Sequence, residues 1–280
     1  FNLDEYYPMK PHEQQSYVRF MHEQLFDHVD IAPENINIPH GTLKPEDIPA
    51  FCANYERKIA DLGGIDFQVL CIGRSGHIVF NEPGSSRDGL TRLIVLDRIT
   101  RLDAANDFFG EENVPRRALT MGIATVMGAK RIVMLAFGEG KAAVVTRAVE
   151  GPVTSACPAS YLQQHPNVTV YLDAAAAALL TRTRCPWTVA PITRWNEEAV
   201  RHAVIWLAEE RRKTILELVN EDYNEAGLQD LLASRGDVHE INVDVFRELT
   251  ATITGWPGGK PQSAKRPGDI DRPADRIFPK

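Results

Sequence analysis

The sequence is poor in cysteine, in long apolar runs and in clustered positive charge. Four cysteines occur among 280 residues, at positions 52, 71, 157 and 185, and no two of them have C-x-x-C spacing. Dispersed thiols favour a reduced compartment over a disulfide framework, so we expect a cytoplasmic protein. No apolar run approaches the length of a membrane span and no signal peptide is visible, which argues against a membrane protein. A net charge of −7 without a Lys/Arg cluster argues against nucleic acid as a partner.

What the sequence does contain is enough apolar material for a folded core. Hydrophobic residues make up 44% of the chain and charged residues 25%, a balance typical of globular proteins. The length suits one large α/β domain, alone or with an appendage. An acidic protein can still bind an anionic metabolite if positive groups gather in one pocket, so a small molecule is the expected partner. Whether the chain forms a homo-oligomer stays open.

Helix and strand patterns take turns in the first part of the chain. Apolar spacing predicts a helix over residues 13–28 and a second helix over 48–62, stopped by Gly63 and Gly64. The segment "IDFQVLCIG", residues 65–73, is a short apolar run without clear alternation. This pattern predicts a strand that is buried on both faces, as in a parallel sheet.

The alternation continues up to residue 183. We expect strands at 93–96, 130–138 and 167–173, and helices at 118–129, 141–151, 158–165 and 174–183. Strands and helices that alternate in this way predict the α/β class, with a parallel sheet flanked by helices.

The character of the sequence changes at about residue 187. We expect an α/β domain over residues 1–186, a helical extension over 187–254 and a Pro/Gly-rich linker or tail over 255–280. The extension is rich in charge and lacks strand patterns; its two predicted helices cover 197–219 and 225–235.

The stretch "CIGRSGHIVFNEPGSS" follows the predicted strand and carries many chemically capable side chains. In open parallel sheets, ligands bind at the carboxyl ends of the strands. Gly73 and Gly76 allow close backbone approach, His77 can exchange a proton near neutral pH, and Glu82 can orient or charge that imidazole. The alternative is a capped turn with an incidental histidine. A metal site at His77 and Glu82 is less favoured, because no second His or Cys has ligand spacing.

Two further segments could carry chemistry. Asp4 and Glu5 come just after a strand-like opening, where a carboxylate could serve as a general base or simply form a polar loop. The segment "FGEGKAA" places Lys141 in a glycine turn before a helix. Backbone N–H groups, the helix dipole and an ammonium could together hold a phosphate there, although the same pattern also occurs for packing reasons.

Taken together, these segments resemble a known family. The blocks are "FNLDEY", "GHIVFNEPGSS", "NVPRRALTMGIATVMGAKRIVMLAFGEGKA" and "EGPVTSACPASYLQQHPNVTVYLD". Their order and approximate spacing resemble the glucosamine-6-phosphate deaminase (isomerase) family from Phe1 to Arg182. The resemblance implies a Rossmann-like sheet and the conversion of glucosamine 6-phosphate to fructose 6-phosphate and ammonia, without a metal or an organic cofactor.

The resemblance also implies roles for single residues. Asp4 matches the carboxylate base that moves a proton between C2 and C1 of the opened sugar, and His77 matches the histidine that helps open the pyranose ring. Glu82 matches the carboxylate that supports this histidine, and Lys141 matches the phosphate-binding lysine.

Three neighbouring residues complete the expected site. Glu5 and Gly76, which lie in the matching blocks, are expected to bind substrate. Ser75 stands where many members have an aspartate beside the histidine, so we expect it to take part in catalysis. A hydroxyl can orient an imidazole, but it cannot stabilise the imidazolium as a carboxylate would.

The sequence departs from the family in two further places. Asp107 lies near the position of a phosphate-binding arginine in members of the family. The family's Gly/Thr phosphate loop lies upstream of the FN-x-DEY block, at which the present sequence begins. We therefore expect residues 1–280 alone to be poorly stable and inactive, and an added upstream segment to restore both properties.

Part of an effector site is also recognisable. Ser85, Ser86 and Arg92 resemble part of the effector site of allosteric members, but Ile94 occupies the position of a lysine, so we make no claim of allostery from the sequence. The part after residue 187 resembles the connecting region of longer proteins, in which an LmbE/PIG-L-type deacetylase domain follows.

Two other functions compete with the deaminase. A 6-phosphogluconolactonase-like hydrolase would share the fold and a related Gly-x-x-Gly-His block, whereas "FNEP" and "FNLDEY" favour the deaminase. A non-catalytic sugar-phosphate-binding domain would account for Ser75 and Asp107.

Overall fold

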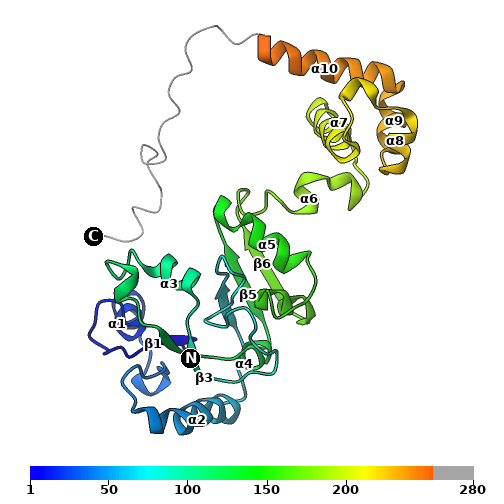
Figure 1. The fold of residues 1–280 in the computed structure, drawn as a ribbon. Coiled ribbons are helices and arrows are strands. Elements are labelled where there is room, and N and C mark those ends of the chain that lie inside the picture. Colours follow the sequence, from blue (N-terminus) through cyan, green and yellow to red (C-terminus); the bar gives the residue numbers. More distant parts are fainter. Residues whose placement is uncertain (255–280) are drawn as a thin grey trace. The chain divides into compact units, whose positions relative to one another are not determined.

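The computed structural model describes residues 1–254, which form two compact units, residues 1–184 and the residues from 185 onward (Figure 1). Each unit has its own apolar core. The tail expected at 255–280 lies outside the described residues. Among the described helices, none is long and apolar enough to cross a membrane.

A three-stranded parallel sheet forms the centre of the first unit. Its strands are β2 (Gln68–Cys71), β5 (Ile132–Ala136) and β6 (Val168–Leu172), in the spatial order β2-β5-β6. Helix α5 (Ala142–Val149) follows β5 and packs its apolar side chains into the same core. The predicted helix-flanked parallel sheet is therefore confirmed. Because parallel strands end at the same edge of a sheet, the loops that follow β2 and β5 lie close together.

A second, antiparallel sheet lies in the same unit and was not predicted as a sheet. Its strands are β1 (Asp4–Tyr7), β3 (Arg92–Val95) and β4 (Arg117–Thr120), with β4 between the other two. The prediction of a helix over 118–129 is therefore wrong in its first part. The central position of β4 buries Ala118 and Leu119 completely, and a run buried on both faces has no strand periodicity. Only α4 (Ile123–Met127), which begins after Gly122, is helical.

Strand β2, at the edge of the parallel sheet, is covered on one face only. The core beneath it includes Leu70, Ile132 and Met134, whereas Val69 on the opposite face of β2 is 44% exposed. The prediction of a strand buried on both faces is therefore wrong for β2 within the described residues. The apolar run indicated a parallel strand correctly, but it did not report how much of the sheet is covered.

Two predicted helices differ from the structure in length. Helix α2 (Ile48–Asp61) agrees with the prediction, but α1 (Tyr17–Gln24) is much shorter than 13–28, because the backbone of Leu25 leaves the helical region. The helix predicted at 174–183 is wrong for most of its length, since only α6 (Thr181–Arg184) is helical. The carboxylate of Asp173 instead accepts hydrogen bonds from the backbone N–H groups of Gly138 and Ala176.

Two short elements complete the first unit. Helix α3 (Arg98–Ala104), which was not predicted, is capped by the side chain of Asp97, which accepts a hydrogen bond from the N–H of Ile99 at 2.7 Å. The helix predicted at 158–165 is a 3-10 helix over Pro158–Gln164.

The second unit is helical in its described part. Its helices are α7 (Glu197–Arg211), α8 (Asn220–Glu225), α9 (Gln229–Arg235) and α10 (Val238–Thr254). The helix predicted at 197–219 is too long, because Arg212 adopts a left-handed conformation with a φ of 53° and ends α7. Thr214 then caps a separate 3-10 turn at Ile215–Glu217.

Glu5 joins the antiparallel sheet to helix α1. Its carboxylate is buried, with an exposed fraction of 1%, and accepts hydrogen bonds from Ser16 Oγ at 2.8 Å and from the N–H groups of Tyr17 and Val18 at 3.2 Å. These N–H groups belong to the first turn of α1, which has no intrahelical partners for them. Glu5 therefore caps α1 from the neighbouring strand.

We expect Glu5→Ala to destabilise the first unit strongly. The variant takes the Glu5 acceptor from the hydroxyl of Ser16 and from the N–H groups of Tyr6 and Tyr17, whereas the N–H of Val18 keeps Ser16 Oγ at 3.1 Å. This loss costs on the order of 2–4 kcal/mol of unfolding free energy. Urea unfolding measures this loss. Glu23→Ala, which removes an exposed ion pair with Arg19 on the same helix, is the matched control and should cost less than about 1 kcal/mol. Equal losses in the two variants would show that the cap adds no stability.

Candidate functional site

The loop after β2 lies at the carboxyl edge of the parallel sheet and depends on two glycines. Gly76 has a φ of 93°, and a Cβ atom there would lie 2.7 Å from Cys157 Sγ. A Cβ atom on Gly73 would collide with the imidazole of His77. Only glycine fits at both positions. The loop can therefore fold back so that the imidazole of His77 lies against Gly73, near the start of the loop.

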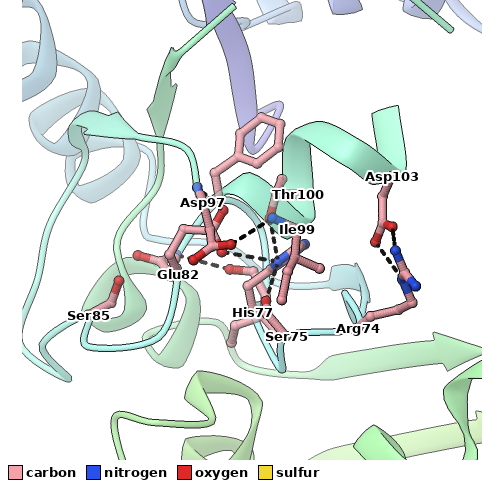
Figure 2. A network of polar contacts seen from close by, with 12 residues as sticks. Arg74, Ser75, His77, Glu82, Ser85, Asp97, Ile99, Thr100 and Asp103 are labelled. Atoms are coloured by element: carbon pink, nitrogen blue, oxygen red, sulfur yellow. Dashed lines mark hydrogen bonds and ion pairs between the residues drawn. The ribbon is translucent and has the colours of Figure 1, made fainter. Parts of the chain in front are cut away.

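The imidazole of His77 is surrounded on one side by three oxygen-bearing side chains (Figure 2). His77 Nδ1 lies 2.9 Å from Ser75 Oγ, 3.2 Å from Thr100 Oγ1 and 3.3 Å from Glu82 Oε2. The His77 side chain is 15% exposed, and that of Glu82 is 12% exposed. The structure therefore brings together three of the predicted residues, Ser75, His77 and Glu82, in a nearly dry cluster.

Glu82 is held as an ionised group. Burial by itself would raise the pKa of Glu82, but hydrogen bonding to His77, to Thr100 and to the backbone N–H of Asp97 holds this pKa below its ordinary value. The Asp97 N–H donates to Glu82 Oε1 at 3.1 Å. The other oxygen, Oε2, is buried and faces His77 without a strictly aligned donor.

Thr100 belongs to this cluster although sequence reasoning missed it. It lies in α3, is 5% exposed and reaches His77 from 23 residues further along the chain. No pattern in the sequence distinguishes it from other threonines, because the contact depends on how α3 packs over the loop.

Asn81 is a second residue that sequence reasoning did not single out. Its buried side-chain amide donates to the carbonyl oxygens of Ile78 and Met121, at 3.1 and 2.8 Å, and its oxygen accepts from Arg92. Asn81 thus ties the loop that carries His77 to the residue after β4. The "FNEP" block in which it lies was the available signal.

Asp4 lies in β1, opposite Thr120 of β4. Thr120 Oγ1 accepts a hydrogen bond from the N–H of Phe80 at 3.2 Å, which places this pair of strands beside the loop that carries Glu82. Burial, and to a smaller extent the charge of Glu5, raises the pKa of Asp4 to about 8. A carboxylate with a raised pKa is a stronger base than an ordinary aspartate.

Glu5 does not belong to the cluster around His77. Successive side chains of a strand point to opposite faces, so the side of β1 that carries Asp4 is not the side that carries Glu5. The donors around Glu5, described above, give it a structural task in this structure.

Lys141 lies after β5 and faces the loop that carries His77. Its Nζ donates to the carbonyl oxygen of Ile72 at 2.7 Å, directly before Gly73. An ammonium has three donors, so two remain for another acceptor. The glycine turn before Lys141 has fewer N–H groups available for a ligand, because the N–H of Gly138 donates to both oxygens of Asp173 at 3.0 Å.

Gly76 contributes backbone rather than side-chain chemistry to the site. The carbonyl oxygen of Gly76 accepts a hydrogen bond from the N–H of Ala159 at 2.9 Å. Within residues 1–254, no three His, Cys, Asp or Glu side chains are grouped so that they could hold a metal ion.

The sequence model of the family described as glucosamine-6-phosphate isomerases/6-phosphogluconolactonase matches residues 1–171. A glucosamine-6-phosphate deaminase-like protein from Bacteroides thetaiotaomicron is 46% identical over 263 residues, which are 94% of this chain and 40% of that protein. A protein from Rhodopirellula baltica named glucosamine-6-phosphate deaminase is 48% identical over 182 residues, which are 65% of this chain and 72% of the relative. The chain therefore spans less than half of the Bacteroides relative.

Solved structures are similar over the same region. A monomeric glucosamine-6-phosphate deaminase is 42% identical with a TM-score of 0.61, and the match covers 64% of this chain and 73% of that protein. A 6-phosphogluconolactonase from Trypanosoma cruzi has a TM-score of 0.50 at 21% identity, covering 65% of this chain and 72% of that chain, which shows a shared fold only.

The raised pKa of Asp4 predicts how stability depends on pH. The unfolded chain ionises Asp4 near its ordinary pKa of 3.8, whereas the folded protein keeps the proton up to about pH 8. Between these values the folded state binds more protons, so the free energy of unfolding falls as the pH rises and levels off above about pH 8. Asp4→Asn cannot ionise and should remove this part of the slope.

Urea unfolding of the wild type and of Asp4→Asn at about pH 5 and about pH 9 checks this. The variant should lose less stability than the wild type on going to the higher pH. Asp66→Asn, at an exposed carboxylate paired with Lys130, should retain the wild-type slope. The same pH dependence in all three proteins would contradict a raised pKa of Asp4.

Proposed function

Since this chain belongs to the family of glucosamine-6-phosphate isomerases and 6-phosphogluconolactonases, we propose that it is the catalytic part of a glucosamine-6-phosphate deaminase. The observation that carries the proposal is that the first unit contains two different groups suited to proton transfer. One is an imidazole against an ionised, buried glutamate, and the other is an aspartate whose pKa is raised. Opening a sugar ring needs an acid–base group such as the imidazole, and moving a proton between carbons needs a carboxylate base such as the aspartate.

His77 acts on the closed sugar. It takes the proton of the C1 hydroxyl and returns a proton to the ring oxygen as the bond between C1 and that oxygen breaks, which yields the open aldehyde. The positive charge on the ring is transient, and Glu82 stabilises it at a distance of 3.3 Å.

Asp4 acts on the open sugar. Its carboxylate removes the proton from C2, and the electrons form the C1–C2 double bond. The π electrons of the C1 carbonyl pass to its oxygen, which takes a proton from water to give an enolamine. Protonation at C1 then leaves an iminium at C2, to which water adds before ammonia departs. The carbonyl oxygen at C1 accepts the electrons in the first step, and the lone pair of the substrate's own nitrogen forms the iminium in the second. The residues named here therefore supply every proton transfer to carbon.

Lys141 and the backbone around Gly76 are the proposed contacts to the substrate. The two free donors of the Lys141 ammonium suit the phosphate group, and this residue already lies against the loop that carries His77. Glu5 enters the substrate site only indirectly, by fixing the strand that carries Asp4.

A 6-phosphogluconolactonase-like activity is the second candidate. Hydrolysis of a lactone needs an activated water and no base at a carbon atom, so it would leave the raised pKa of Asp4 without a task. A binding domain without catalysis would likewise leave the buried pair of His77 and Glu82 without a task.

We also propose a cellular location and a longer architecture for the protein. The four free cysteines support a cytoplasmic location. The match to the Bacteroides relative extends over the helical unit and covers 40% of that protein. This agrees with a longer architecture, for which we propose an LmbE/PIG-L-like deacetylase domain after the described part.

We expect the full-length protein to release ammonia from glucosamine 6-phosphate and to form fructose 6-phosphate. Asp4→Asn should lower kcat by roughly 10²- to 10⁴-fold, because the variant has lost the base at C2. A coupled assay for ammonia measures both, with Asp66→Asn as the control that keeps its activity. Hydrolysis of 6-phosphogluconolactone without ammonia release would favour the second candidate.

His77 and Glu82 should behave as one unit. If Glu82 acts only by supporting His77, the double variant His77→Gln, Glu82→Gln is barely slower than the slower single variant. Steady-state rates of the three variants and the wild type complete the cycle. Losses that multiply in the double variant would mean that the two side chains work on separate steps.

A further inference from the structure

Helix α3 lies against the loop that carries His77 but has little apolar packing of its own. Of its seven residues, only Thr100 is buried. Ile99 and Leu102 are each 44% exposed, and Ala104 adds a small contact with the apolar cluster that includes Tyr6. A helix of this length is not stable by itself in water, so α3 depends on its contacts with the rest of the unit. Polar contacts therefore decide where it lies.

Two polar contacts join the first part of α3 to the loop. The N–H of Asp97, the residue that caps the helix, donates to Glu82 Oε1 at 3.1 Å. One turn further on, Thr100 Oγ1 lies 3.2 Å from His77 Nδ1 (Figure 2). These contacts fix the start of α3 and bring its buried hydroxyl to the imidazole.

An ion pair between Arg74 and Asp103 joins the last part of α3 to the same loop (Figure 2). Arg74 Nε donates to Asp103 Oδ2 at 3.1 Å, and Arg74 Nη2 donates to Oδ1. Both side chains are partly exposed, and a single bond between such groups would contribute little. Two parallel bonds, however, fix the orientation of the guanidinium and the carboxylate as well as their separation.

The spacing of these residues couples the ion pair to the imidazole. Residues three apart on a helix lie on the same face, so Thr100 and Asp103 face the loop together. On the loop, Arg74 likewise precedes His77 by three residues. The two contacts therefore close a small ring, which runs along the loop and returns along α3. Without the ion pair, the helix would be attached to the loop by its first part alone.

We propose that Arg74 and Asp103 are positioning residues, whose ion pair holds α3 on the loop and thereby keeps Thr100 Oγ1 against His77 Nδ1. The pair acts through the loop and the helix, and it does not touch the reacting atoms. Contacts to Nδ1 leave Nε2 as the ring nitrogen for the sugar. The inference rests on the proposed function for its effect on ammonia release. The contact between α3 and the imidazole does not depend on the substrate.

Charge removal and charge exchange test the proposal in the full-length protein. Asp103→Asn removes the carboxylate, Asp103→Arg and Arg74→Asp each place like charges together, and the double variant exchanges the two charges. Glu111→Gln is the matched control for Asp103→Asn. Glu111 pairs with Arg98 and Arg101 of the same helix, at 3.5 and 3.3 Å, but is not among the partners of the loop in the described part of the chain.

Two measurements report the outcome. In the ammonia assay, Asp103→Asn should lose about threefold to tenfold in kcat with little change in KM, and the single reversals should lose more. The exchange variant should regain most of the loss. In nitrogen-15 NMR of histidine-labelled protein, the His77 signal, assigned with His77→Gln, should move in Asp103→Asn and return towards its wild-type position in the exchange variant. The signals of the other histidines show that each variant is folded.

Glu111→Gln should match the wild type in both measurements. An exchange variant as slow as the slower single reversal would overturn the proposal, as would an unmoved His77 signal in Asp103→Asn. Equal changes in Glu111→Gln and Asp103→Asn would also overturn it, because they would reflect the charge of the helix rather than its attachment to the loop. If the wild type released no ammonia, the proposed function would fail, while the NMR comparison would still decide the role of the ion pair.

Discussion

The buried, ionised carboxylate of Glu82 is the group on which the arrangement of the site depends. Its two oxygens are used differently: Oε1 accepts from the N–H of Asp97 and fixes the start of α3, whereas Oε2 faces the imidazole of His77. A charge in a nearly dry environment is costly unless it is paired, and the nearby imidazole and hydroxyl offset this cost. The same requirement that keeps Glu82 charged therefore brings His77 and helix α3 to one place.

Asp4 and Glu5 show how one strand separates two neighbouring carboxylates. Glu5 is buried and Asp4 is half-buried, and loss of water raises the pKa of each. Glu5 receives donors from Ser16 and from the first turn of α1, so its charge is compensated by structure. No such donors lower the pKa of Asp4, and the residue is left with the basicity that a carbon acid requires. A strand that alternates its faces thus places adjacent carboxylates in two different environments, one with several donors and one without them.

The sequence was a good guide where chemistry depends on neighbours along the chain and a poor guide where it depends on packing. His77, Ser75 and Glu82 lie within eight residues, and their contact could be anticipated from the loop that follows a buried strand. The contact of Thr100 could not be anticipated, because it arises from the packing of the short helix α3, which no strong sequence pattern predicts. The strand β4 was mistaken for a helix because it is buried on both faces, which removes the alternation on which the assignment depends.

The central claim is that His77 and Asp4 act on different atoms of one opened amino sugar. The most direct measurement is an experimental structure of the full-length protein with the open-chain analogue in which the aldehyde of glucosamine 6-phosphate is reduced to an alcohol. We expect the Asp4 carboxylate at about 3–3.5 Å from C1 or C2, His77 Nε2 within hydrogen-bond reach of the C5 oxygen, and Lys141 on the phosphate. An analogue bound with its C1 and C2 atoms away from Asp4, or with Nδ1 of His77 facing the sugar, would contradict it.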